Sequence, residues 1–216
     1  MVFNKTHRTK TCFPIEHSIP LKLDGLLEMP KRFLGGEIDQ NYGALYFFEH
    51  YIDYHKFEYV VEFGSRAGAL SLFLANIAGA TEQFLFHTFE IDKKIDFYNR
   101  EKGGVGHWFE NLETITPYIK SFEMDVFTQD VINILIPNIA QYKTFIFCDN
   151  GYKVGEFNGY APLLKSGDCI ACHDWGTEVF QHDIELTIQK CNLVLDEPWA
   201  TSNIDLKNLI RPFKKV

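Results

Sequence analysis

The sequence predicts a single doubly wound α/β domain, built on a mostly parallel seven-stranded sheet with an antiparallel edge strand. Three features of the chain carry this prediction. From about residue 57, short apolar runs alternate with helical stretches, most of these runs are apolar throughout, and two further apolar runs follow residue 176. Strand–helix alternation predicts right-handed parallel crossovers. Strands without polar alternation are typical of a sheet covered on both faces.

The elements follow in chain order. Parallel strands are expected at residues 57–63, 83–90, 119–124, 143–148 and 168–173, and the runs at 191–196 and 206–213 are expected to close one edge as an antiparallel pair. Helices are expected at residues 67–79, 92–101, 128–140, 153–165 and 177–190, with a further helix at 40–55 packed beside the sheet. Pro137 and Pro162 should each end or kink a helix, because proline lacks the N–H that an interior helical position donates.

Composition and charge limit the partners of the chain. The 216 residues carry a net charge of −8, so nucleic acid, which needs a basic footprint, is not an expected partner. No apolar run approaches the roughly 18 residues that span a bilayer, and residues 1–18 lack the apolar core of a signal peptide. We therefore expect a cytoplasmic protein with no membrane partner; a homo-oligomer is compatible with the sequence.

The five cysteines are scattered along the chain, and an odd, dispersed set argues against a disulfide framework. Cys169 and Cys172 have C-x-x-C spacing. On a strand, however, residues three apart point to opposite faces, and no second pair completes a zinc site. We expect these two cysteines to be ordinary core residues.

Polar residues follow the predicted strands at their carboxyl ends, where doubly wound sheets bind ligands. The first strand ends in "VVEFGSRAG", with Glu62 before Gly64, and Gly68 opens the next helix. Glycines at such a junction allow a tight turn and a close approach of a ligand to free helix N–H groups. Arg66 occupies the middle glycine position of a dinucleotide-binding loop, where it would crowd a pyrophosphate. A tight turn that serves packing alone is the alternative.

Acidic residues recur at the next two strand ends. The second strand ends in "HTFEID", where Glu90 can accept two hydrogen bonds from a ribose diol. The third ends in "EMDVF", where Asp125 can accept a hydrogen bond from an adenine amino group. A single acid of this kind is usually a solvated loop residue, but acids at successive strand ends point to a nucleoside-like ligand.

The fourth strand ends at Asp149, and the fifth ends in His173 and Asp174. An imidazole with a pKa near 6.5 can take the proton of a substrate hydroxyl as general base, and either carboxylate can orient it. Lys153 is a weaker base candidate, because its pKa would have to be lowered. Alternatively, His173 caps the following helix while Trp175 packs in the core.

These motifs together resemble a class I S-adenosylmethionine (SAM)-dependent methyltransferase with a Rossmann-like fold. "VVEFGSRAG", "HTFEID" and "FEMDVF" resemble its first three strand-end motifs, and "TFIFCDNGYKVGEFNGYAPLLKSGDCIACHDW" resembles a block of small-molecule and sugar O-methyltransferases. The cephalosporin-hydroxylase and macrolide-sugar types belong to this group. The resemblance covers residues 57–176.

The resemblance implies roles for individual residues. The methionine part of SAM would be held by Glu62, Gly64, Ser65 and Gly68, with Arg66 tolerated beside them because SAM has no pyrophosphate. Glu90 would bind the ribose, and Asp125 with Val126 the adenine. Residues 57–216 would form the SAM-binding methyltransferase domain, and residues 1–56 an N-terminal helical segment on the substrate side.

Catechol-type and macrolide-sugar relatives hold a divalent cation at the fourth and fifth strand ends, and here Asp149, His173 and Asp174 match its ligands. Two carboxylates and an imidazole are a poorer set for Mg²⁺ than three oxygens, so His173 is a candidate both for metal ligand and for general base.

The resemblance predicts methyl transfer from SAM to an oxygen of a small molecule or sugar. Two alternatives stay open: a catalytically silent SAM-binding subunit or binding module, and a nicotinamide-dependent oxidoreductase on the same fold. The segment His107–Phe109 is either a lid over the cofactor or the start of a helix, and the aromatic run at 42–54 is expected in the core.

Overall fold

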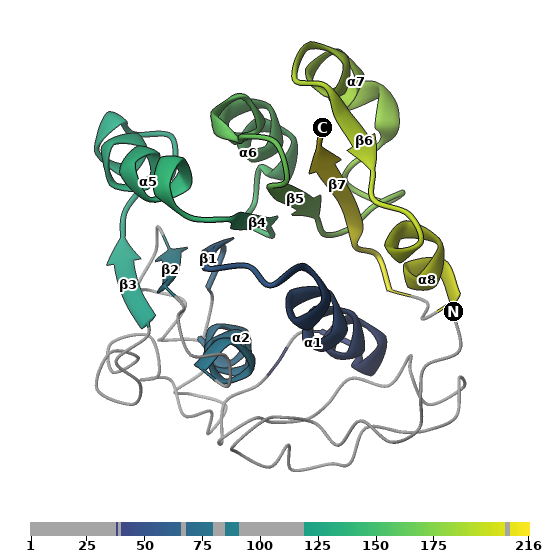
Figure 1. Ribbon diagram of the computed structural model, residues 1–216, viewed down its shortest axis with the longest axis horizontal. Coiled ribbons are helices and arrows are strands. Elements are labelled where there is room, and N and C mark those ends of the chain that lie inside the picture. The colour runs from purple at the N-terminus through teal and green to yellow at the C-terminus, as the bar shows by residue number, and fades with distance from the viewer. Residues whose placement is uncertain (1–37, 39, 66–67, 80–84, 91–118, 206–207) are drawn as a thin grey trace.

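A computed structural model describes residues 38, 40–65, 68–79, 85–90, 119–205 and 208–216. Its strands are β1 (Tyr59–Phe63), β2 (Leu85–Glu90), β3 (Ile119–Glu123), β4 (Thr144–Cys148), β5 (Cys169–Cys172), β6 (Leu193–Leu195) and β7 (Arg211–Lys215). They form one sheet in the order β3-β2-β1-β4-β5-β7-β6 (Figure 1). This is the Rossmann-like α/β sheet that the sequence predicted.

The helices are α1 (Tyr42–His55), α2 (Ala69–Gly79), α5 (Gln129–Gln141), α6 (Lys153–Tyr160), α7 (Gln181–Lys190) and α8 (Trp199–Asp205). Figure 1 shows α1, α2 and α8 on one face of the sheet and α5, α6 and α7 on the other. Each face has its own cluster of buried apolar side chains. Every residue of β1, β4 and β5 is buried, which explains why these strands are apolar throughout.

The antiparallel edge is present, with a different order of strands from a simple terminal hairpin. β7 pairs antiparallel with β5 and with β6, so β7 lies between them. The outermost strand of the pair, β6, therefore runs in the same direction as β5. The last strand in the chain is therefore not at the edge of the sheet, because β7 lies between β5 and β6.

The prediction for Pro137 was wrong as a helix end, since α5 continues through this residue. The buried side chains of Val131, Leu135 and Ile139 lie four residues apart on one face of α5. Packing of this face holds the helix together despite the missing N–H. Pro162 acts as predicted: α6 ends at Tyr160, and a 3-10 turn follows at Ala161–Leu163.

The helix expected at 177–190 begins only at Gln181. The N–H groups of residues 177–179 all donate to the carbonyl of Asp174 and form a turn. The Asp183 carboxylate then accepts from the N–H of Phe180 at 2.9 Å and fixes the helix start. The helix expected at 92–101 lies outside the described residues.

The two C-x-x-C cysteines are buried on opposite faces of β5, as strand geometry predicted. Cys169 belongs to the cluster beneath α1 and α2, and Cys172 to the cluster beneath α5 to α7. Both are fully buried free thiols. They are core residues and do not share a site.

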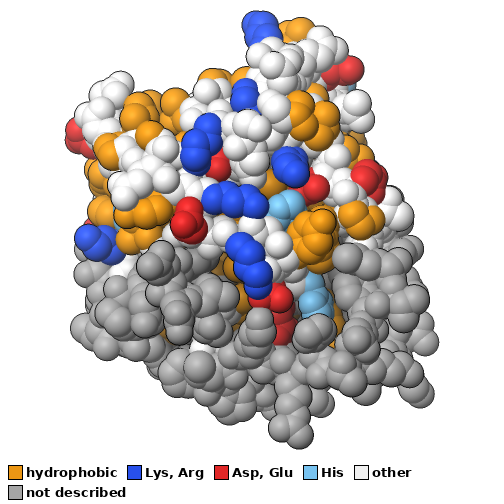
Figure 2. All heavy atoms as spheres, viewed as in Figure 1, with side chains coloured by type: hydrophobic (Ala, Val, Ile, Leu, Met, Phe, Trp, Pro, Cys, Tyr) orange, Lys and Arg blue, Asp and Glu red, His pale blue; other side chains and the backbone are white. Residues whose placement is uncertain are grey.

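The described surface carries charges of both signs. Figure 2 shows Lys and Arg side chains beside Asp and Glu side chains across the middle of one face. On this face the described residues form no large field of positive charge of the kind that binds nucleic acid. Among the described residues, no helix has the length and apolar character needed to cross a membrane.

Helix α1 packs on the sheet and contributes to the hydrophobic core. Its residues include the aromatic run at 42–54, and Phe48 is fully buried with its ring centroid 4.8 Å from that of Phe147 on β4. The aromatic residues of this run are core, as expected, except for Tyr46, which is half-buried against the core, and Tyr54, which is 63% exposed.

We predict that Phe48→Ala lowers the free energy of unfolding by about 3–5 kcal/mol, because it leaves a cavity against β4. Tyr54→Ala, on the exposed side of the same helix, should cost about 1 kcal/mol or less. Urea unfolding of both variants measures the difference. Similar losses in the two variants would show that α1 does not stabilise the sheet.

Candidate active site

Four predicted site residues form one row across the carboxyl ends of neighbouring strands. The N–H groups of Gly64, Asp149 and His173 each donate at 3.0 Å to a carbonyl near the end of the adjacent strand. Glu90 ends β2 beside Gly64. The chain leaves β1 toward β2 and β3 and later returns to β4 on the other side of β1, so Gly64 and Asp149 flank the topological switch point. Ligands of doubly wound sheets bind at this point.

Gly64 is required at the switch point for two reasons. Its φ of +94° lies in the left-handed region that side chains rarely adopt. A Cβ here would also lie 2.5 Å from the carbonyl oxygen of Asp149, which is closer than any real contact. The glycine therefore lets the ends of β1 and β4 come together, which is a role beyond that of a tight turn.

Glu62 lies in β1, two residues before Gly64, and its side chain is fully buried. Its Oε2 accepts hydrogen bonds from the hydroxyls of Ser71 and Thr88, the latter at 2.7 Å. The Ser65 hydroxyl is hydrogen-bonded to Thr88 in turn. The other oxygen, Oε1, has no hydrogen-bond partner among the described residues. Burial raises the pKa of Glu62 to about 8, although the two hydroxyls oppose this rise.

The remaining cofactor candidates differ in exposure. Glu90 is buried, with 5% of its surface exposed. Asp125 is exposed and accepts the N–H of Phe127 at 2.9 Å, while Val126 is buried and its carbonyl accepts the Tyr160 hydroxyl. Gly68 has a φ of +81° at the start of α2. Arg66 and the segment His107–Phe109 lie outside the described residues.

Asp149, His173 and Asp174 come together as predicted. Their ligand atoms lie within 4.8 Å of one another. His173 Nδ1 is 2.9 Å from Asp149 Oδ1 and 3.4 Å from Asp174 Oδ2. Asp174 adopts a left-handed φ of +56°, a conformation that non-glycine residues seldom hold outside functional sites and turns. The His173 side chain is thus held by the carboxylates and does not cap α7.

The Lys153 ammonium completes this group as a second cation. It is 3.0 Å from Asp174 Oδ2, 2.8 Å from Glu178 Oε2 and 4.0 Å from Asp149 Oδ1. Only 7% of the side chain is exposed. Burial alone would lower the pKa of Lys153, but the hydrogen bonds to Glu178 and Asp174 outweigh this effect and raise it. In this arrangement Lys153 is protonated and does not act as a base.

The pKa of His173 follows the same balance. Burial alone would lower it, whereas Asp149 and Asp174 raise it to about 9. The pKa of Asp174 falls because of its hydrogen bond to His173, and that of Asp149 rises because its burial outweighs the attraction of His173. At neutral pH the site therefore holds an imidazolium and an ammonium between carboxylates, and His173 becomes a base only above its raised pKa.

Trp175 packs against neighbouring side chains, as the alternative interpretation of the "HDW" triplet predicted. Its ring centroid is 5.8 Å from that of Phe213, and the Arg211 guanidinium lies 5.3 Å from the ring. Packing of Trp175 and the ionic role of His173 therefore coexist at the end of β5.

Sequence reasoning missed two residues of the site. Glu156 on α6 is fully buried, and neither carboxylate oxygen has a hydrogen-bond partner among the described residues. Gln40, before α1, donates from Nε2 to Asp149 Oδ2 at 2.9 Å. An acid one turn into a short helix is a weak signal for Glu156. Gln40 had no local signal, because its partner is 109 positions away in the chain.

Comparison with known proteins identifies the fold. No protein-family model and no curated protein sequence matches the chain. An apo structure of CmcI superposes with a TM-score of 0.63 at 11% identity, covering 87% of this chain and 76% of that one. CmcI with SAH gives 0.56 at 11% identity, covering 87% and 82%. CmcI with Mg and SAM gives 0.59 at 11% identity, covering 87% and 77%. The chain therefore shares the Rossmann-like fold of CmcI.

We predict that Glu156 makes stability depend on pH. Burial raises the pKa of Glu156 to about 8. The nearby backbone N–H of Asn150 offsets only part of this rise, and it is not placed to form a regular hydrogen bond with the carboxylate. In the unfolded chain glutamate titrates near pH 4.3. Between these values the folded state binds the extra proton, so the free energy of unfolding falls as pH rises, by up to about 1.4 kcal/mol per pH unit.

Glu156→Gln removes this proton. Relative to the wild type, the variant should gain stability steadily from about pH 5 to about pH 8 in urea unfolding. Glu62 titrates in both proteins and cancels. The control is Glu185→Gln at an exposed position of α7. A stability difference that does not change with pH would mean that Glu156 is ionised in the folded protein.

Proposed function

We propose that the protein is a SAM-dependent methyltransferase that acts on an oxygen of a small molecule or sugar. The single observation that carries this proposal is Glu62: a buried carboxylate at the switch point with one oxygen bonded to two hydroxyls and the other without a partner. A buried carboxylate needs a partner for such an oxygen, and the ammonium group of methionine is one. CmcI, which shares the fold, is known with SAH and with Mg and SAM.

The other residues of the row fit the same ligand. Glu90, one strand away and nearly buried, would accept the ribose hydroxyls, and Val126 would line the adenine. The turn that contains Gly64, Ser65 and Gly68 leads into the N-terminus of α2, next to these residues. A dense group of carboxylates at this edge favours a cationic ligand over an anionic one. SAM supplies an electrophilic methyl group when bound.

The acceptor would lie near Asp149 and His173, since these close the switch point on the β4 and β5 side. His173 Nδ1 faces the two carboxylates, which leaves Nε2 for a proton from the acceptor hydroxyl. With its raised pKa, His173 takes that proton only after losing its own. Gln40 holds Asp149 Oδ2 from the N-terminal side, which supports a substrate-side role for residues 1–56.

A divalent cation would be held by Asp149, His173 and Asp174, where it would polarise a substrate oxygen. The positions fit, because three ligand atoms converge. The charges fit less well. Lys153 already pairs with Asp174 at 3.0 Å, and His173 carries a proton at neutral pH. A cation therefore competes with both, and an imidazole in the set favours a transition metal over Mg²⁺.

The first test is calorimetric titration with SAM and SAH. Glu90→Ala should weaken binding about 100-fold, because it removes two charge-assisted hydrogen bonds of about 1.5 kcal/mol each. Glu185→Ala on α7 is the matched control. With Glu62 protonated below about pH 8, binding of an ammonium should release about one proton per chain at pH 7. Titration in buffers of different ionisation enthalpy measures this proton, and Glu62→Gln should abolish it.

Each alternative function has its own signature. Binding of NAD(H) in place of SAM and SAH would support a nicotinamide-dependent oxidoreductase. SAM binding without turnover of any hydroxylated acceptor, unchanged in His173→Gln, would support a silent subunit. Binding that survives Glu90→Ala unchanged would mean that the ligand lies elsewhere.

Lys153 supplies a separate prediction about the cation. Lys153→Met keeps the aliphatic stem and removes the competing ammonium, so Mn²⁺ should bind at least about tenfold more tightly than to the wild type. Mn²⁺ titration followed by water-proton relaxation measures the affinity. Asp174→Asn in the same background should reverse the gain. Unchanged Mn²⁺ affinity in Lys153→Met would show that this group of residues is not a cation site.

A further inference from the structure

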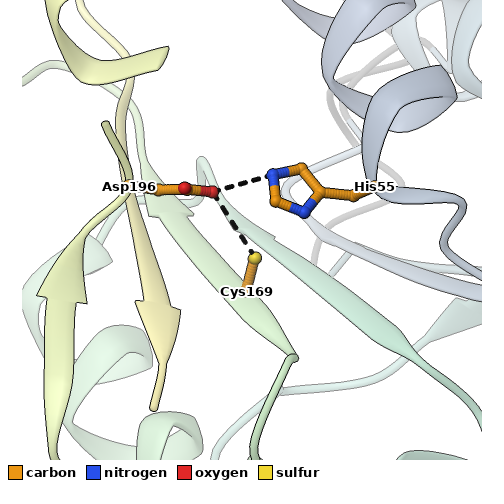
Figure 3. A group of neighbouring side chains, drawn as sticks. All are labelled: His55, Cys169 and Asp196. Atoms are coloured by element: carbon orange, nitrogen blue, oxygen red, sulfur yellow. Dashed lines mark hydrogen bonds and ion pairs between the residues drawn. The ribbon is translucent and has the colours of Figure 1, made fainter. Parts of the chain in front are cut away.

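A second group of metal-binding side chains lies away from the proposed active site, between α1 and the β5–β6 side of the sheet (Figure 3). His55 is the last residue of α1, Cys169 begins β5, and Asp196 follows β6. All three are buried, with 5%, 0% and 7% of their surfaces exposed. Three elements far apart in the chain thus present an imidazole, a thiol and a carboxylate to one another in the core.

The three ligand atoms lie within 4.8 Å of one another. His55 Nε2 is 2.9 Å from Asp196 Oδ2, and Cys169 Sγ is 3.8 Å from the same oxygen. Tetrahedral zinc places ligand atoms about 3.3–3.8 Å apart, given bonds of about 2.0 Å to nitrogen and oxygen and about 2.3 Å to sulfur. The group therefore has the size of a metal site before any side chain moves far.

The imidazole of His55 shows that its contact with Asp196 is not an ordinary hydrogen bond. Although Nε2 is 2.9 Å from the carboxylate oxygen, it has no hydrogen-bond partner of normal geometry among the described residues. In Figure 3 the ring nitrogen and the sulfur approach the same carboxylate from two directions.

Charge supports the same interpretation. The Tyr51 hydroxyl donates to Asp196 Oδ2 at 2.6 Å and His55 Nε2 lies 2.9 Å from the same oxygen, so two polar groups already face this carboxylate in the core. A divalent cation bound to one carboxylate, one thiolate and one neutral imidazole gives a site with no net charge. Burial of such a site costs far less than burial of an isolated charge.

We propose that His55, Cys169 and Asp196 form a structural binding site for a borderline-soft divalent metal ion of the zinc class. Imidazole, thiolate and carboxylate are the ligands that zinc uses in proteins, and the thiolate excludes Mg²⁺ and Ca²⁺ as natural occupants. Binding replaces the S–H bond of Cys169 with a metal–sulfur bond and releases one proton to solvent. Three protein ligands would leave one tetrahedral position for a water molecule.

Tyr51 acts in support of the metal ligands. Its hydroxyl donates to Asp196 Oδ2 at 2.6 Å, as outer partners of ligating carboxylates do. The Tyr51 ring also packs edge-on against His55, at 4.5 Å between centroids, and the Phe57 ring stacks on the imidazole at 5.1 Å. These rings fix the imidazole plane, so the metal would tie the end of α1 to β5 and to the residue after β6.

This site is independent of the proposed active site. Cys169 begins β5, whereas His173 follows its end, about 13 Å along the strand at 3.3 Å per residue. Cys169 also lies on the α1 face of the sheet, opposite Cys172. The metal would therefore stabilise the fold and not take part in catalysis.

The test uses Co²⁺ as a spectroscopic probe and Zn²⁺ as the ligand, added to the full chain freed of metal by chelation. One equivalent of Co²⁺ should produce thiolate-to-cobalt charge-transfer absorption, and one equivalent of Zn²⁺ should displace it and raise the melting temperature. Cys169→Ser should abolish the absorption. Cys191→Ser, which changes another buried thiol outside the group, should retain it.

Two further variants keep the test decisive if Cys169→Ser folds poorly. Asp149→Asn alters the proposed active site and should leave the cobalt absorption unchanged. Tyr51→Phe should weaken Zn²⁺ binding about tenfold, as loss of an outer partner does. Folded wild-type protein without saturable Co²⁺ absorption, or absorption that persists in Cys169→Ser, would overturn the proposal and leave a buried hydrogen-bonding network.

Discussion

The approach of the Gly64 backbone to the Asp149 backbone is the constraint on which the rest of the site depends. A Cβ at Gly64 would lie 2.5 Å from the Asp149 carbonyl oxygen, so only glycine lets β1 and β4 meet at the switch point. This contact aligns Glu90, Gly64, Asp149 and His173 in one row. Residues that the proposed function assigns to two different substrates are thereby held together at the ends of the central, buried strands.

Buried charge is distributed unevenly along this row. On the β4 and β5 side, Asp149 and Asp174 are balanced by the imidazolium of His173 and the ammonium of Lys153. The other half of the site, Glu62 on β1 and Glu156 on α6, has no hydrogen-bonded cation among the described residues, and burial raises the pKa of both to about 8. The first half of the site is electrostatically complete in itself. The second half is poised for a cationic ligand, which is the physical basis for the proposed cofactor.

Helix α1 serves both ends of the molecule. Its aromatic residues cover the sheet, and the segment before it places Gln40 on Asp149. Its last residue, His55, meets Asp196 and Cys169 at the other side of the core. Gln40 and helix α1 are therefore tied to the sheet at the proposed substrate side and at the proposed metal site.

The sequence by itself determined the α/β class, the five parallel strands to within two residues and the row of strand-end acids, because buried parallel strands are continuously apolar and their ends share one edge of the sheet. It also placed Cys169 and Cys172 on opposite faces. Only the tertiary structure decided that α5 continues through Pro137, that β7 lies between β5 and β6, and that Gln40 and Glu156 join the site. These features depend on packing and on charges that meet across long stretches of chain. The ionic state of His173 was also decided by the tertiary structure. Its pKa depends on two neighbouring carboxylates and on burial, and neither can be predicted from the local sequence.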